Sequence, residues 1–313
     1  MFLFGNKGVE FSPEKDIPSL KGKVIVVTGG SNGLGKQAIL EYARHEPKQI
    51  WLAARDTTKA KAALDEIKQQ VPNASIKTVQ LDLASLDSVA TAAKTVLAES
   101  DRLDILMLNA GIMATSPDLT KDGYEMQFGT NHMGHALLTK LLLPLLDKTA
   151  KSGADVRVAV LSSKAHGMAP KQGIVFDSLK TKASEMGAMQ RYGQSKFANM
   201  LFARQLAKER PSLTVAAIHP GVVTTNLLAG STALWEPVRW GVALLAYTPF
   251  LVTVETGVKG QLWATVSKDV QSGEYYEPIG VGDTAIALGK DDDLAKKLWD
   301  WTETELDAYI SRK

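Results

Sequence analysis

A tyrosine and a lysine stand four residues apart in the sequence, at Tyr192 and Lys196. On a helix this spacing puts both side chains on one face, one turn apart. A phenol with a reference pKa near ~10 is a poor proton donor and acceptor at neutral pH unless its anion is stabilised. A lysine ammonium beside it would lower that pKa, so the pair could move a proton to or from a bound molecule. Such pairs are also common on solvated helix surfaces, so the surroundings must decide.

A glycine-rich segment, Thr28–Gly35, lies directly between a strand-like run and a helical pattern. Glycines let the backbone turn sharply and approach a pyrophosphate closely, and the start of a helix attracts its negative charge. The spacing T-G-x-x-x-G-x-G therefore predicts a dinucleotide site, with a turn that needs glycine for geometry alone as the alternative. The residues expected to contact the cofactor here are Gly29, Ser31, Asn32, Gly33, Leu34 and Gly35.

The second strand-like run ends at Arg55, and neither Ala53 nor Ala54 supplies a carboxylate. Folds selective for NAD usually place a carboxylate here to hold the ribose 2′-hydroxyl. An arginine can instead pair with a 2′-phosphate, whose charge a carboxylate would repel. Arg55 therefore predicts NADP as the cofactor, with NADPH preferred over NADH. A surface ion pair between Arg55 and Asp56 is the alternative.

Strand-like and helical segments alternate along the chain and must position these residues. Runs rich in Val, Ile and Leu predict strands at Lys23–Thr28, Gln49–Ala53, Ile76–Asp82, Leu103–Asn109, Val156–Ser162 and Leu213–His219. Helices are expected at Leu34–His45, Thr57–Gln70, Ser85–Ala98, within Tyr124–Leu146 as one long helix, and at Arg191–Lys208, Glu255–Val266 and Leu294–Leu306. This alternation implies parallel pairing through right-handed crossovers. The predicted fold class is α/β, a doubly wound parallel sheet or Rossmann fold.

The alternation is not divided by any repeat, low-complexity tract or Pro/Gly/Ser linker. We therefore expect a single catalytic domain over residues 21–313. Residues 1–20 are polar and punctuated by proline, so we expect them to form an N-terminal arm that wraps the surface or is partly mobile.

Composition excludes several kinds of chemistry and partner. The formal charge of +2, from 36 basic and 34 acidic residues, gives no reason to expect nucleic acid. The sequence has no cysteine for disulfides or thiolate chemistry, and His132 and His135 lack the neighbours of a metal site, so no metal is expected. The start of the sequence is unlike a secretory signal, and the apolar stretch Trp240–Val254 is shorter than the ~20 residues of a spanning helix. A cytoplasmic protein is expected, one that at most touches a membrane or lipid surface.

The order of the motifs resembles that of the short-chain dehydrogenase/reductase family. Thr28–Gly35 is similar to its cofactor fingerprint, Asn109–Gly111 to its N-A-G segment, and His219–Thr225 to its P-G-x-V-x-T segment. Tyr192–Lys196 lies where the family has its catalytic pair, and the resemblance extends from Leu20 to about Leu306. The retinol-dehydrogenase-like branch, which includes WW-domain oxidoreductases and protochlorophyllide reductases, is indicated by Asn131–Leu138, His219–Gly221, Glu255–Ala264, Ser272–Tyr276 and Leu294–Leu306.

The resemblance implies further contacts with the cofactor. The family contacts adenine just after the third strand, supports the sheet and ribose with N-A-G, and binds the nicotinamide carboxamide with the threonine of its last motif. The residues implied in this way are Asp82, Leu83, Asn109, Ala110, Gly111, Tyr192, Lys196, Pro220, Gly221, Val223 and Thr225.

The resemblance also implies four catalytic residues, Asn131, Ser163, Tyr192 and Lys196. Tyr192 would deliver or remove the proton while the Ser163 hydroxyl holds the substrate oxygen, with Ser162 as the alternative serine. The lysine and the oxidised nicotinamide would both lower the pKa of the phenol. Asn131 would hold a water that links the lysine to a proton path, and it could also bend its helix.

In the family a variable helical lid over the substrate follows the last cofactor motif. The corresponding segment here, residues 227–254, carries Leu227, Leu228, Leu234, Trp235, Trp240, Leu244, Leu245, Tyr247, Phe250 and Leu251. A lid this apolar predicts a small-molecule substrate that is bulky and hydrophobic or aromatic: a ketone, aldehyde or secondary alcohol. Core packing or the surface of a homodimer is an equal alternative, and docking on a membrane surface is a third. Residues 164–190 are expected to form part of the pocket wall.

Together these expectations describe an NADP(H)-dependent oxidoreductase that transfers a hydride between the nicotinamide and a carbonyl or alcohol carbon, with ketone or aldehyde reduction favoured. A C=C reductase of the protochlorophyllide-reductase type shares the tyrosine and lysine. A non-catalytic cofactor-binding scaffold is the other alternative, because fold alone does not give function. A scaffold would be expected to have lost a catalytic residue, and all four are present.

Overall fold

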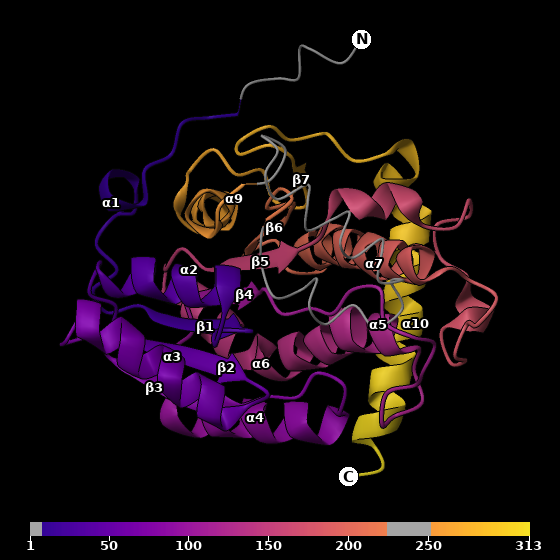
Figure 1. Ribbon diagram of the computed structural model, residues 1–313, viewed down its shortest axis with the longest axis horizontal. Coiled ribbons are helices and arrows are strands. Elements are labelled where there is room, and N and C mark those ends of the chain that lie inside the picture. Colours follow the sequence, from indigo (N-terminus) through magenta and orange to yellow (C-terminus); the bar gives the residue numbers. More distant parts are fainter. Residues whose placement is uncertain (1–7, 224–251) are drawn as a thin grey trace, which may run out of the picture.

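Seven parallel strands form one sheet in the computed structural model, which describes residues 8–223 and 252–313 (Figure 1). The strands are β1 (Val24–Thr28), β2 (Gln49–Ala54), β3 (Ile76–Gln80), β4 (Ile105–Leu108), β5 (Arg157–Leu161), β6 (Thr214–Ile218) and β7 (Tyr275–Tyr276). Their order is β3-β2-β1-β4-β5-β6-β7, and all neighbours are parallel. The chain winds outward in both directions from the junction of β1 and β4, so the predicted doubly wound parallel sheet is confirmed.

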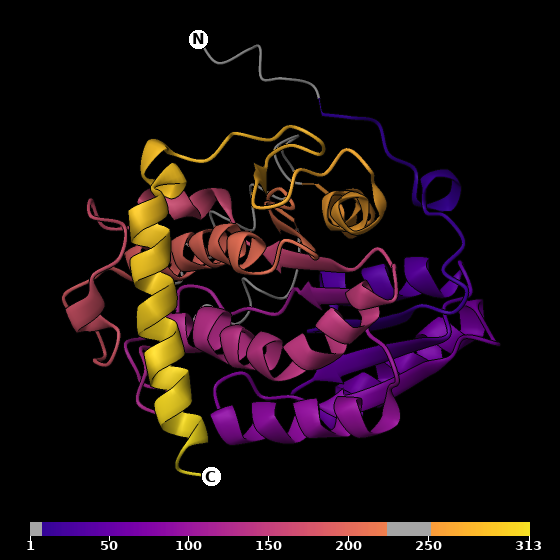
Figure 2. The same ribbon diagram turned by 180° about the vertical axis from the view of Figure 1, so that it is seen from behind.

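Helices cover both faces of the sheet and give two hydrophobic layers. One layer contains α2 (Gly33–Ala43), α3 (Thr57–Gln70) and α9 (Val254–Val266). The other contains α4 (Leu86–Glu99), α6 (Gly134–Lys151), α7 (Ala188–Glu209) and α10 (Asp292–Ile310), with α10 crossing α7 and packed against it (Figure 2). Along β1, Val24 and Val26 face the second layer and Ile25 and Val27 the first. Alternate side chains point to opposite faces, which is why the strand is apolar throughout.

Side-chain caps explain where several of these helices begin. A short polar side chain at the N-cap accepts a hydrogen bond from a backbone N–H that has no partner inside the helix. The residues that do so before α2, α3, α4, α9 and α10 are Asn32, Asp56, Ser85, Thr253 and Asp291. The same kinds of residue mark these helix starts in the sequence.

The long helix predicted within Tyr124–Leu146 is instead three successive segments. They are the short helix α5 (Met126–Phe128), a π-helical turn η1 (Gly129–Met133) and α6. A Cβ atom added at Gly134 would lie 2.4 Å from the Leu83 carbonyl oxygen, so close backbone packing surrounds the π turn. A π turn inserts one residue into the helical repeat and re-aims the side chains around it. Local hydrophobic periodicity does not record such an insertion.

Several short elements complete the described chain. The helical ones are α1 (Pro13–Asp16), η2 (Lys164–Met168), η3 (Phe176–Ser178) and η4 (Ala287–Lys290). Within the expected N-terminal arm, Phe11, Ile17 and Leu20 are buried in the layer that contains α9, and α1 contacts α9. Most of the predicted lid, residues 227–254, lies outside the described residues. None of the helices in the described ranges is both long and apolar enough to cross a membrane.

Candidate active site

A cleft of about 430 Å³ opens at the carboxyl ends of the strands. It spans the junction of β1 and β4, where the strand order reverses, which is the usual ligand position in open α/β sheets. The predicted residues that line it are Gly29, Ser31, Asn32, Gly33, Leu34, Arg55, Asp82, Leu83, Asn109, Ala110, Gly111, Tyr192, Lys196 and Pro220. Segments far apart in sequence therefore meet along one cleft. Ser162, the alternative serine, also lines it, whereas sequence reasoning missed Ala54, Asp56, Lys59, Leu81, Ile112, Thr130 and Leu161 as lining residues.

The glycine-rich loop forms one end of the cleft at the start of α2. Gly29 and Gly33 have φ values of 69° and 51°, a left-handed conformation that glycine adopts at little cost. The Asn32 side chain accepts a hydrogen bond of 2.8 Å from the Gly33 N–H. Gly35 does not line the cleft. It allows α2 to pack closely against the loop, because a Cβ atom there would lie 2.3 Å from the Gly29 carbonyl oxygen.

Thr28 ties the end of β1 to the N-A-G segment after β4, a role that sequence reasoning missed. Its hydroxyl oxygen accepts hydrogen bonds of 2.9 and 3.0 Å from the backbone N–H groups of Asn109 and Ala110. The same hydroxyl lies 2.9 Å from Nε2 of His135, whose Nδ1 lies 2.9 Å from the Asn131 carbonyl oxygen. Burial lowers the pKa of His135 to about 3, so its ring is neutral and Nδ1 must carry the proton given to that carbonyl. The histidine therefore joins the β1 end to the π turn.

Two cations, Arg55 and Lys59, line the cleft near the end of β2. The alternative pairing of Arg55 with Asp56 is not formed, because the Asp56 carboxylate accepts bonds of 3.0 Å from the N–H groups of Thr58 and Lys59. The second oxygen of Asp56 lies 3.9 Å from Nζ of Lys59. Within residues 8–223 and 252–313 no acidic side chain pairs with Arg55. Lys59 lies in the first turn of α3, and this position was the sequence signal that could have indicated it as a second cation near the end of β2.

Tyr192 and Lys196 both lie on α7, with Lys196 Nζ 5.8 Å from the centre of the tyrosine ring. The Ser163 hydroxyl lies near enough to the Tyr192 phenol to lower its pKa, and it accepts a 3.1 Å bond from the Ala165 N–H. The Ser162 hydroxyl also reaches the cleft, but it donates a 2.7 Å bond to the Lys196 carbonyl oxygen. Of the two serines, Ser163 therefore faces the phenol.

Burial sets the protonation of this pair. Burial raises the pKa of Tyr192 to about 12, and the Ser163 hydroxyl offsets this only in part. Burial also lowers the pKa of Lys196 to about 8, while its ammonium donates a 3.0 Å bond to the Leu161 carbonyl oxygen. Desolvation therefore sets the pKa of the phenol, and the lowering expected from the lysine does not offset it. At neutral pH the phenol is protonated and can donate.

Asn131, in the π turn, joins the segment after β4 to α7. Its side-chain oxygen accepts a 2.8 Å bond from the Ile112 N–H, and its side-chain nitrogen donates to the Ile112 carbonyl and to the Ser195 hydroxyl, each at 2.9 Å. A Cβ atom added at Gly111 would lie 3.1 Å from Oδ1 of Asn131 and 3.3 Å from Nζ of Lys196. Asn131 and Lys196 therefore adjoin the same glycine at the inner end of the cleft.

The last predicted cofactor segment is described only in part. Pro220 lines the cleft, Gly221 has a φ of 87°, and Val223 pairs with Val252 through a single parallel bridge. Thr225 lies outside the described residues.

His132 is buried, and its Nε2 lies 3.0 Å from the Thr302 hydroxyl on α10. In the described ranges no three His, Asp or Glu side chains gather in a way that could hold a metal ion.

Comparisons with known proteins identify the family of the chain. The family model for short chain dehydrogenases matches residues 23–234. The chain is 38% identical over 307 residues to the short-chain dehydrogenase/reductase drtF of Aspergillus calidoustus, covering 93% of this chain and 95% of that protein. It is 37% identical over 294 residues to retinol dehydrogenase 13 of Homo sapiens, with 90% and 83% covered. A crystal structure of an uncharacterized protein from Mycobacterium Paratuberculosis superposes with a TM-score of 0.72 and 28% identity, covering 96% of this chain and 98% of that one. The chain therefore belongs to the short-chain dehydrogenase/reductase family of oxidoreductases and lies close to its retinol dehydrogenase branch.

Proposed function

We propose that the protein is an NADPH-dependent reductase of bulky hydrophobic ketones or aldehydes. The observation that carries this proposal is the protonated Tyr192 phenol, which lies near Ser163 and Lys196 in a cleft with a glycine-rich cradle. The cradle and the cations near β2 suit the pyrophosphate and phosphate groups of a dinucleotide. When bound, its nicotinamide supplies the hydride.

The side chains around the phenol suit the acid step of a carbonyl reduction. The hydroxyl groups of Ser163 and Tyr192 lie near each other, so one carbonyl oxygen could accept a hydrogen bond from both. As negative charge develops on that oxygen, the Ser163 hydroxyl stabilises it and Tyr192 donates its proton. The Lys196 ammonium then stabilises the phenolate, which burial alone would disfavour.

The preference for NADPH rests on the end of β2. A 2′-phosphate bound there would meet Arg55, which is free of acidic partners among the described residues, and the nearby Lys59. The carboxylate of Asp56 is turned to the start of α3, where it accepts two backbone N–H groups. The arrangement offers positive charge to a phosphate and leaves no free carboxylate for a 2′-hydroxyl.

The hydrophobic substrate is supported by the surface next to the catalytic residues. Met168 and Val222 are exposed to 50% and 55%, and they follow Ser163 and Gly221 closely in the sequence. The Met168 backbone packs against Gly193, next to Tyr192, and Val222 follows the lining residue Pro220 by two positions, so these exposed apolar side chains favour an apolar ligand or cover near the cleft. The human relative is named for retinol, a hydrophobic alcohol.

The test is consumption of NADPH and NADH by the purified protein with a panel of bulky ketones, aldehydes and conjugated alkenes, with products identified by mass. We expect NADPH-dependent conversion of a carbonyl to an alcohol. A saturated carbonyl product would instead identify a C=C reductase. The matched variant is Tyr192→Phe, which should bind NADPH like the wild type and lose turnover. Undiminished turnover in that variant would refute the acid role of the phenol, and tight NADPH binding without turnover by the wild type would favour a scaffold.

A further inference from the structure

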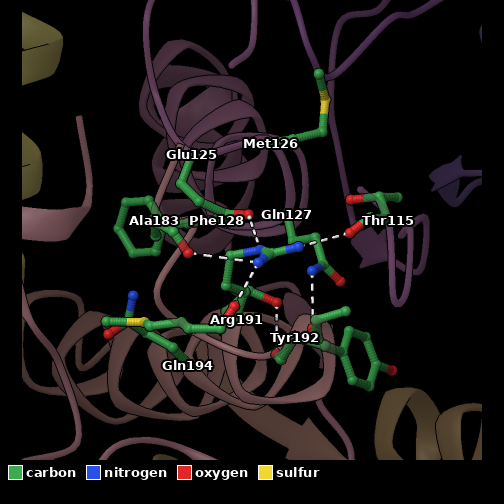
Figure 3. A network of polar contacts seen from close by, with 12 residues as sticks. Thr115, Glu125, Met126, Gln127, Phe128, Ala183, Arg191, Tyr192 and Gln194 are labelled. Carbon is green, nitrogen blue, oxygen red and sulfur yellow. Dashed lines mark hydrogen bonds and ion pairs between the residues drawn. The ribbon is translucent and has the colours of Figure 1, made fainter. Parts of the chain in front are cut away.

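Arg191, the residue directly before Tyr192, is buried in an ion pair with Glu125 (Figure 3). Nε of Arg191 lies 3.2 Å from Oε1 of Glu125, and the two side chains are 2% and 0% exposed. Burial raises the pKa of Glu125, opposed by the backbone N–H groups of Phe128 and Gln127 and by the guanidinium. Buried ion pairs often add little net stability, because desolvation offsets their attraction. Stability alone is therefore a weak reason for this pair.

The guanidinium joins two segments that belong to no strand or long helix. Its Nη2 atom donates a 2.7 Å bond to the Thr115 carbonyl, in the segment that follows β4. Its Nη1 atom donates to the carbonyl of Met186 at 2.6 Å and to that of Ala183 at 3.4 Å, both in the segment that leads into α7. Figure 3 shows the side chain reaching in these directions from one turn of α7. One planar cation thus fixes both segments and the N-cap of α5.

Both segments carry strained backbone at the points where the network holds them. Ala114 and Ala183 have φ values of 49° and 46°, a left-handed conformation that is unfavourable for residues with a Cβ atom. The Gln127 side-chain oxygen accepts a 2.8 Å bond from the Ala114 N–H, and its nitrogen donates a 3.0 Å bond to the Ala188 carbonyl at the start of α7. Such strain persists only where the surroundings enforce it.

The network lies beside the reacting groups. Ile112 lines the cleft, and Asn131 already clamps it to Ser195 on α7. The Arg191 contacts form a second clamp, which ties Thr115 in the segment after β4 to Met186 just before α7, from a residue next to Tyr192. Together the two clamps determine how the phenol is oriented relative to the segment after β4.

We propose that Arg191, paired with Glu125, is a positioning residue that holds the two segments at the substrate side so that the Tyr192 phenol meets the carbonyl oxygen. The proposal rests on the acid role proposed for Tyr192. The fork of an arginine can donate to Thr115 and Met186 while it faces a carboxylate. A lysine ammonium has no planar fork and cannot reproduce that geometry.

The test compares Arg191→Lys with Arg157→Lys. Arg157 is also a buried arginine, paired with Asp155 through two bonds and donating to the Ser267 carbonyl, but it lies at the amino end of β5, away from the cleft. We expect both variants to lower the melting temperature. Only Arg191→Lys should lower kcat/KM for the carbonyl substrate, by about tenfold or more, while the Kd for NADPH stays within about twofold.

Two further variants and two contrary outcomes complete the test. If Arg191→Lys does not fold, Glu125→Gln, which keeps an acceptor for the Phe128 N–H, should give the same loss of kcat/KM with unchanged NADPH binding. The two single changes combined should lose little more than either alone, because they act through one pair. Kinetics that follow only the melting temperature, as in Arg157→Lys, would overturn the positioning role. Absence of turnover in the wild type would instead contradict the proposed function.

Discussion

At the residue scale, the protonation of Tyr192 and Lys196 determines the pH range of the reaction. Below about pH 8 Lys196 keeps its ammonium, which can stabilise the phenolate left after proton donation. Above that pH the ammonium is lost, and burial again disfavours the phenolate, as the raised pKa of Tyr192 indicates. We expect kcat/KM for reduction to be level below about pH 8 and to fall towards a tenfold loss per pH unit above it.

The measurement is kcat/KM against pH at saturating NADPH, because this ratio reports ionisations before substrate binds. The matched variant is Lys196→Met, which should be slow and should lack the fall near pH 8. A wild-type profile that stays level to pH 10 would show that the lysine charge does not assist the proton transfer.

Arg55 carries the second prediction at this scale. Arg55→Ala should weaken NADPH binding by about tenfold or more, the size expected for a lost charge-assisted hydrogen bond, and leave NADH binding nearly unchanged. The Kd values of both nucleotides can be measured by titration of the purified protein. Lys61→Ala is the control, because Lys61 is an exposed cation of α3 that pairs with Asp65 and does not line the cleft. Equal weakening of both nucleotides would place Arg55 at a part that they share.

At the element scale, Gly35 shows how close packing under α2 supports the loop. A Cβ atom there would lie 2.3 Å from the Gly29 carbonyl oxygen and 2.6 Å from Nδ2 of Asn109. Neither atom can move freely, because one is backbone and the other donates to the Thr28 carbonyl at 2.9 Å. Gly35→Ala should therefore destabilise the fold by about 1–3 kcal/mol and weaken NADPH binding.

Thermal unfolding and NADPH titration check this prediction. Gly187→Ala is the control, because Gly187 has a φ of −60° and no atom within 4 Å of an added Cβ. The control should behave like the wild type in both measurements. A Gly35→Ala protein that matches it would show that the loop has room to relax.

The elements that the sequence predicted are those whose signals are local. The strands and most helices follow from hydrophobic periodicity, and the glycine loop follows from spacing. The π turn was missed because hydrophobic periodicity does not record an inserted residue, and because Gly134, directly after the turn, packs against Leu83, which is distant in sequence. The two-residue strand β7 was missed because it is too short to show a pattern.

The candidate site divides in the same way. The residues that line the cleft could be predicted because motif order along a doubly wound sheet brings strand ends together. The pairing of Ser163 rather than Ser162 with the phenol depends on how one side chain turns at the end of β5. The contacts of Arg191 could not be predicted either, because its partners are backbone carbonyls that no residue type reveals.

At the scale of the whole molecule, the two edges of the sheet differ in what they contribute. The carboxyl ends of the strands hold the cleft. Near the opposite edge, just before β4, the fully buried Asp104 accepts a 2.9 Å bond from the Val24 N–H and two bonds, of 2.8 and 2.6 Å, from Arg102. Its own carbonyl accepts a 2.8 Å bond from the Arg157 N–H. The residue thereby joins β1, β4 and β5 where the strands begin.

Asp104→Ala should therefore lower stability and leave the cleft unchanged. Removing the carboxylate leaves the buried Val24 N–H without that acceptor and Arg102 without its partner, a loss of about 2–4 kcal/mol. The melting temperature should fall by roughly 2–4 °C for each kcal/mol, while the Kd for NADPH at 20 °C below the new midpoint should match the wild type. Asp65→Ala, which breaks the exposed pair with Lys61, should barely move either value. An Asp104→Ala protein that unfolds like this control, or that binds NADPH more weakly while still folded, would contradict the separation of the two edges.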